Sequence, residues 1–153
     1  MKRARVSGLE GPGPDVLVNV APFHEAPAET IGRGVHLVLE EAGLRDAELS
    51  VTLLGDDAIR ALNREYLDRD HVTDVLAFSL GEAGGPVLGD VYVGFEQARR
   101  QAAELGVDPD EEVVRLAIHG TLHVLGHDHP EGADRGASPM FALQERLLRR
   151  VVG

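Results

Sequence analysis

The sequence predicts an α+β fold: a single domain in which a small mixed sheet of about four strands packs with about five helices. Short apolar segments typical of strands alternate with longer segments whose apolar residues recur at helical spacing. One helical segment, residues 113–125, is apolar on nearly all sides, which indicates a central buried helix. The 153 residues suffice for one such core but not for two ordinary domains.

The first half of the chain is predicted to hold two strands and two helices behind a lead-in. In order, the segments are a loose lead-in over 1–14, a strand over 15–20, a helix over 30–42, a strand over 47–54 and a helix from about 57 to 66. The lead-in is rich in glycine, proline and charge. Gly43 follows the first helix where a helix typically stops, and Leu49, Val51 and Leu53 share one face of the second strand. Residues 15–153 therefore form the predicted domain.

The second half is predicted to hold two more strands and three helices. The segments are strands over 74–80 and 89–93 around a glycine-rich turn, and helices over 95–105, 109–125 and 138–151. Gly106 ends the first of these helices. Asp108 is suited to cap the next helix, Pro109 to occupy its first position and Glu111 to complete a capping box. This central helix is the expected carrier of the functional residues.

Composition restricts the classes of protein to which the chain can belong. The absence of cysteine excludes disulfides and thiolate ligands, so a metal would be held by histidine and carboxylates. A formal net charge of −11 disfavours a protein that coats nucleic acids. No apolar run approaches the roughly 20 residues that span a bilayer, and glycine and proline occupy the place of a signal-peptide core. We therefore expect a cytoplasmic protein without a membrane partner.

Four of the seven histidines fall between residues 119 and 129. His119 and His123 are four residues apart on the predicted central helix, so both rings project from one face, as two ligands of one ion require. A third ligand must come from beyond the helix. In a continued helix His129 would lie about 15 Å from His119 along the axis, so the chain has to turn back.

Gly126 is well placed for that turn, because glycine easily adopts the left-handed conformation that ends many helices. The turn favours His129 as the third ligand, with His127 as the competing candidate. We predict one zinc ion on His119, His123 and His129, which are then catalytic through metal-bound water. Three imidazoles leave a tetrahedral ion one open position for that water, as in catalytic zinc sites.

The same histidine spacing occurs in metzincin proteases, so peptide hydrolysis has to be considered. Those proteases need a glutamate directly after the first histidine as general base, and this chain has Gly120 there. A metalloprotease is therefore the less favoured interpretation.

Residues 119–129, HGTLHVLGHDH, resemble the signature HGxLHLxG-any-DH of the YbeY family, bacterial endoribonucleases of ribosomal RNA maturation. The resemblance continues upstream in the segments from Leu62 to Tyr66 and from Asp70 to Phe78, and in Gly89-Asp90-Val91. Only Val124 departs from the usual leucine within the signature. The order of the predicted elements also agrees from about residue 15 to the end of the chain.

The resemblance implies a metal-dependent endoribonuclease that cleaves single-stranded RNA, processes ribosomal RNA precursors and contributes to ribosome quality control. It also implies that His119, His123 and His129 are the metal ligands, and that small ribosomal subunit proteins are potential partners. The chain departs from the family at Leu67, where an arginine commonly follows the tyrosine. Arg64 or Arg69 is the candidate to supply that charge to RNA; without it, the catalytic step is weaker or different.

Two further expectations follow. Six arginines are individually expected to be solvated surface residues and as a set are a hypothesis for the contact with RNA: Arg60, Arg64, Arg69, Arg99, Arg100 and Arg115. The alternative function from another class is a zinc-stabilised ribosome assembly factor with little intrinsic hydrolysis.

Overall fold

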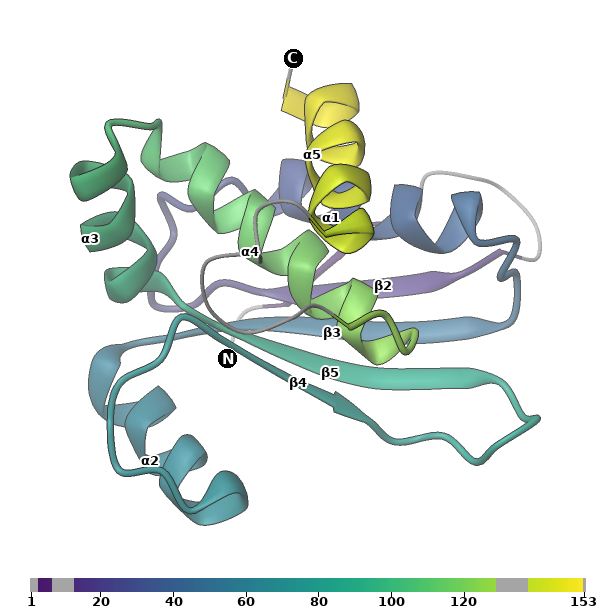
Figure 1. The fold of residues 1–153 in the computed structure, drawn as a ribbon, viewed down its shortest axis with the longest axis horizontal. Helices are drawn as coiled ribbons and strands as arrows, with labels where there is room; N and C mark the ends of the chain where they lie inside the picture. The colour runs from purple at the N-terminus through teal and green to yellow at the C-terminus, as the bar shows by residue number, and fades with distance from the viewer. Residues whose placement is uncertain (1–2, 7–12, 129–137, 153) are drawn as a thin grey trace.

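A computed structural model describes residues 3–6, 13–128 and 138–152, and five helices and five strands lie within them (Figure 1). In chain order the elements are β1 (Arg3–Val6), β2 (Asp15–Asn19), α1 (Ala28–Glu41), β3 (Ala47–Leu54), α2 (Asp56–Leu67), β4 (Val75–Ser79), β5 (Val87–Gly94), α3 (Phe95–Leu105), α4 (Pro109–Val124) and α5 (Pro139–Val152). None of the helices in these ranges is both long and apolar enough to cross a membrane.

The five strands form one mixed sheet in the order β1-β2-β3-β5-β4. Strands β2, β3 and β5 run parallel, while β1 and β4 are antiparallel edge strands. The crossover from β2 to β3 contains α1, because parallel neighbours cannot be joined by a hairpin. Strands β4 and β5 are consecutive and pair as a hairpin around the glycine-rich segment that was predicted to turn.

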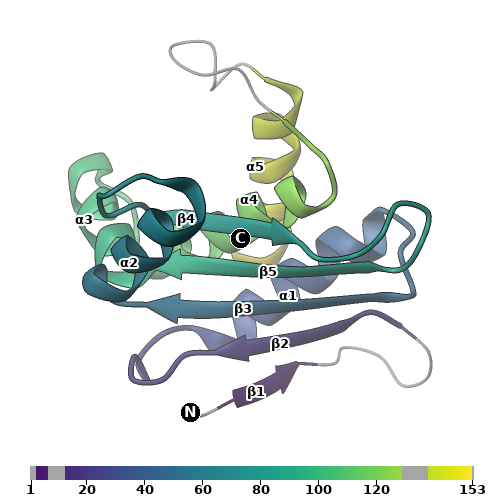
Figure 2. The ribbon, with the colours of Figure 1, turned by 90° about the horizontal axis from the view of Figure 1, so that it is seen from below.

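Helices α1 and α4 cover one face of the sheet, and α3 and α5 pack against α4, whereas α2 lies beyond the opposite face (Figures 1 and 2). The core lies between the sheet and α1 and α4. Leu49, Val51 and Leu53 point into it from β3, as their alternation predicted. Eleven of the sixteen residues of α4 are buried, so the prediction of a central helix is confirmed.

The predicted α+β class is confirmed, and the boundaries of β3 and α3 agree with the predicted ones. One strand was missed. The lead-in expected over 1–14 contains β1, which pairs with β2 through Arg3↔Asn19 and Val6↔Val16. A four-residue edge strand is stabilised by backbone pairing to its neighbour, and it is too short to give a periodic apolar pattern.

Two glycines let α4 approach the sheet closely. A Cβ atom on Gly120 would lie 2.5 Å from Cγ1 of Val91, and one on Gly89 would lie 2.6 Å from Cγ1 of Val124. Both distances are below any real contact between carbon atoms. Helix α4 therefore lies directly against β5, and this contact fixes the height of its histidines above the sheet.

Candidate metal centre

Both ends of α4 are fixed by local hydrogen bonds. At the start, the Asp108 carboxylate accepts a hydrogen bond from the backbone N–H of Asp110, and Pro109 occupies the first turn. At the end, Gly126 has a φ of +94°. The Gly126 N–H donates to the carbonyl of His123 and the His127 N–H to the carbonyl of Leu122, each at 3.0 Å. These two bonds are those of a Schellman cap, so the predicted turn at Gly126 is confirmed.

The two histidines of α4 converge through their Nε2 atoms, which lie 3.0 Å apart. The rings are 4.6 Å apart between centroids and inclined by 80° to each other. His119 is 7 % exposed, whereas His123 is only partly buried. The i, i+4 spacing thus brings two ring nitrogens to one point at the surface end of a buried helix, as predicted.

The other nitrogen of each ring faces a carbonyl oxygen. His119 Nδ1 lies 2.6 Å from Oε1 of Gln144 on α5, and His123 Nδ1 lies 3.0 Å from the backbone oxygen of His127. Gln144 Nε2 donates to the carboxylate of Glu145 at 3.0 Å, so the amide oxygen is the atom directed at His119. Because carbonyl oxygens only accept, the Nδ1 of each ring carries a proton, which leaves Nε2 as the nitrogen with which each ring could bind a metal.

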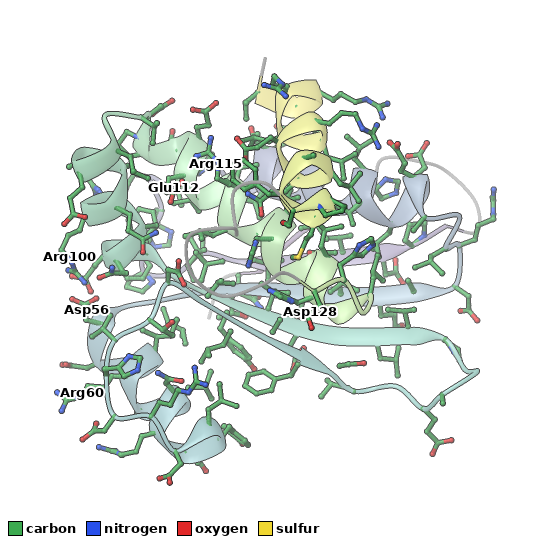
Figure 3. The ribbon with its side chains drawn as sticks, viewed as in Figure 1. Asp56, Arg60, Arg100, Glu112, Arg115 and Asp128 are labelled. Atoms are coloured by element: carbon green, nitrogen blue, oxygen red, sulfur yellow. The ribbon has the colours of Figure 1, made fainter. Side chains whose placement is uncertain are left out.

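This donor set fits a divalent cation. Imidazole is a ligand that zinc prefers, and here two imidazoles have converging Nε2 atoms and are each oriented by a carbonyl acceptor at Nδ1. Within the described ranges no group of three His, Cys, Asp or Glu residues could hold a metal ion. His127 and Asp128 (Figure 3) are described, so neither completes a three-residue group with His119 and His123. His129, the predicted third ligand, lies outside the described residues.

Arg115 extends this arrangement along α4 and α5 through ion pairs with Glu112, which Figure 3 labels beside it, and with Glu145. The Arg115 guanidinium donates to Glu112 at 2.7 Å and to both carboxylate oxygens of Glu145, at 2.9 and 3.2 Å. Burial acts to raise the pKa of Glu145, but hydrogen bonds from Arg115 and Gln144 outweigh it and hold that pKa below its ordinary value. Burial likewise opposes the charge of Arg115, and the two carboxylates outweigh it and raise its pKa. Arg115 and Glu145 therefore stay charged at neutral pH.

The position of Arg115 corrects the expectation of a solvated surface residue, because its side chain is only 19 % exposed. Glu112, Arg115, His119 and His123 are three, four and four residues apart, so they form one polar stripe on an otherwise apolar helix. That spacing was a signal available in the sequence. Gln144 gave no such signal, because its role depends on how α5 packs against α4.

A cleft of about 310 Å³ opens beside His119. Among the described residues its lining includes Asp74 of the upstream segment, Arg115, His119 and Gln144. Arg64 and Arg69, the predicted RNA contacts, do not line it. Arg64 lies on α2, Arg69 follows that helix, and Arg64 faces Asp70 at 3.7 Å. Leu67, at the end of α2, is exposed.

The contact below Gly120 gives a steric reason to reject the protease interpretation. A glutamate at this position would have to fit where even a Cβ atom meets Val91 at 2.5 Å, on the side of α4 that faces the sheet. The general base of a metzincin could therefore not be accommodated here, which agrees with the argument from the sequence.

Comparison with known proteins gives a consistent result. The family model described as Endoribonuclease YbeY matches residues 21–152. The chain is 37 % identical to Endoribonuclease YbeY of Persephonella marina, covering 79 % of this chain and 81 % of the relative. It is 43 % identical to that of Thermus thermophilus, covering 76 % and 85 %. The solution structure of TM1509 from Thermotoga maritima superposes with a TM-score of 0.61 at 25 % identity over 88 % of each chain.

Proposed function

This chain belongs to the YbeY endoribonuclease family, and from that premise we propose that it is a zinc-dependent endoribonuclease of single-stranded RNA. The proposed substrate is a ribosomal RNA precursor, cleaved in the cytoplasm during maturation and quality control of the ribosome. Small ribosomal subunit proteins are the proposed partners. The observation that carries the proposal is the convergence of His119 and His123 at 3.0 Å, with both Nδ1 atoms directed at carbonyl oxygens.

We propose that His119 and His123, together with His129, hold the ion. When bound, zinc supplies a Lewis acid that polarises a phosphate oxygen and lowers the pKa of a coordinated water. Gln144 and the His127 carbonyl orient the two described ligands. The Arg115–Glu145 pair in turn fixes the Gln144 amide, because Glu145 accepts hydrogen bonds from both residues. The cleft beside His119 gives the RNA chain access to this centre.

The test compares purified wild-type protein with His119→Ala on single-stranded RNA, duplex RNA and a peptide library, after metal analysis of both proteins. We expect wild type to cleave only the single-stranded RNA. The variant should lose at least about a thousandfold in rate, since a metal centre supplies several kcal/mol of transition-state stabilisation and each 1.4 kcal/mol is tenfold. Identical purification of the variant controls for contaminating ribonuclease.

Two outcomes would contradict this assignment. A zinc-loaded protein that is inert towards all substrates would support the assembly factor, and peptide cleavage would support the protease. Equal RNA cleavage by wild type and variant would show that the activity does not belong to this centre.

A second prediction concerns Gln144. Gln144→Leu keeps the approximate size of the side chain but removes the oxygen that accepts from His119 Nδ1. Loss of such an outer acceptor is expected to weaken zinc binding about 10- to 100-fold. Competition against a chromophoric chelator measures the affinity. Gln144→Glu retains an acceptor oxygen, so its zinc affinity should stay closer to that of wild type. An undiminished zinc affinity in Gln144→Leu would show that Gln144 does not support the metal centre.

A further inference from the structure

Among the described residues, the side chains that line the cleft beside His119 are more acidic than basic. The described lining comes mainly from the end of α3, from α4 and from the start of α5. Figure 1 shows α4 running between the other two helices. Two carboxylates, Asp74 and Glu112, line the cleft among the described residues, against the single guanidinium of Arg115. That guanidinium already donates three hydrogen bonds to Glu112 and Glu145. Apart from the ion proposed at His119, a phosphate entering the cleft would therefore meet two carboxylates and one guanidinium that is already engaged.

Carboxylates suit a different part of a nucleotide. The edges of nucleobases carry N–H groups that donate hydrogen bonds to aspartate and glutamate carboxylates, as in recognition of the cytosine amino group. The cleft also holds the amide of Gln101, a group that both donates and accepts hydrogen bonds and that donates one of its N–H groups to Glu112 at 3.1 Å. Its polar lining thus matches the mixed donors and acceptors of a base edge.

The apolar lining matches the faces of a base. Phe141 on the first turn of α5 is 38 % exposed and Leu105 at the end of α3 is 67 % exposed, and both line the cleft. The Phe141 backbone N–H bonds to the Ser138 hydroxyl at 3.1 Å, which fixes the turn that carries the ring. Arg115 adds a planar group held in place by its carboxylates, and aromatic rings and guanidinium planes are the surfaces on which proteins stack unpaired bases.

We propose that this cleft is a nucleobase pocket that takes one unpaired base of the RNA beside the metal centre, with Phe141 as its stacking residue. The proposal rests on the proposed function and adds a physical basis for the preference for single strands. A base in a duplex is stacked and has its pairing edge occupied, so it enters the pocket only after unstacking, which costs a few kcal/mol. An unpaired base enters without that cost.

The test measures binding of a fluorescein-labelled single-stranded RNA and of the same RNA with abasic internal positions, by anisotropy at 4 °C. Gel analysis after each titration verifies that the RNA is intact. Wild type should bind the RNA with bases at least about fivefold more tightly than the abasic RNA, because stacking one base on an aromatic ring contributes that much or more. Phe141→Ala should lose this preference.

The matched control is Val152→Ala. Val152 has the same 38 % exposure as Phe141 but lies at the other end of α5 and does not line the cleft. This variant should keep the preference for RNA with bases. Phe141→Leu keeps an apolar side chain but lacks the ring, so it should also lose the preference for RNA with bases. It replaces Phe141→Ala in the test if that variant is too unstable to measure.

Equal binding of both RNAs by wild type, or equal weakening of both by the Phe141 variants, would overturn the pocket. RNA cleavage is measured separately. If wild type prefers RNA with bases but does not cleave it, the nucleobase pocket is supported and the proposed endoribonuclease activity is contradicted. If wild type cleaves RNA but binds both RNAs equally, only the nucleobase pocket is contradicted.

Discussion

Gly120→Ala is expected to destabilise the fold by about 1–3 kcal/mol or more, the usual cost of forcing an extra carbon into a well-packed core. The added Cβ would lie 2.5 Å from Cγ1 and 3.3 Å from Cγ2 of Val91, and 3.1 Å from Cγ2 of Val75. Val91 is fully buried on β5, which lies between β3 and β4 in the sheet, and it has no room to withdraw. Helix α4 would have to move off the sheet, and His119 would move with it. Urea unfolding of wild type and variant measures the change.

Val91→Ala provides the internal test of this mechanism, because it removes both Val91 methyl groups, including the one that the new Cβ would meet at 2.5 Å. Alone, Val91→Ala should destabilise the protein through a cavity. The double variant Gly120→Ala/Val91→Ala should lose clearly less free energy of unfolding than the sum of the losses of the two single variants, and a double-mutant cycle measures that difference. Gly85→Ala is the matched control, since its Cβ would only reach ordinary contact at 3.4 Å. Additive effects, or a Gly120→Ala variant as stable as wild type, would show that the close contact does not limit the fold.

The role of Gly120 shows how far the sequence alone could lead. In the sequence, Gly120 was informative because a glycine after His119 cannot act as the general base of a protease. The close contact between Gly120 and Val91 could not be predicted, because it depends on the distance between α4 and β5. Local signals were sufficient for the elements themselves. The cap at Asp108, the turn at Gly126 and the approach of His119 to His123 all depend on residues within one helix and its ends, and all were predicted.

Contacts between helices could not be predicted in the same way. Gln144 lies 25 residues after His119, and only the packing of α5 on α4 brings its amide to the imidazole. Arg115 was expected in solvent because arginines usually are, but Glu145, 30 residues away, holds it half-buried in the cleft. Strand β1 was missed for a related reason: it depends on hydrogen bonds to β2. Interactions that link separate elements thus account for what the sequence did not reveal.

The identity of the third ligand gives a second large effect: His129→Ala is expected to lose bound zinc, while His127→Ala keeps it. His127 contributes its backbone oxygen, which accepts from His123 Nδ1 at 3.0 Å, and alanine supplies the same oxygen. Removing one of three ligands should reduce the affinity by more than the roughly 10- to 100-fold that loss of an outer acceptor costs. Zinc content after dialysis and chelator competition measure both variants.

The His127→Ala variant is a sharp comparison, because the local backbone of His127 is held independently of its imidazole. The Schellman cap fixes the His127 backbone through the bond from its N–H to the Leu122 carbonyl, and alanine preserves that bond as well. A loss of zinc in His127→Ala can therefore be assigned to its imidazole. Zinc lost from His127→Ala and retained in His129→Ala would make His127 the third ligand. Equal retention in both variants would mean that the ion is held by another side chain or by His119 and His123 with solvent.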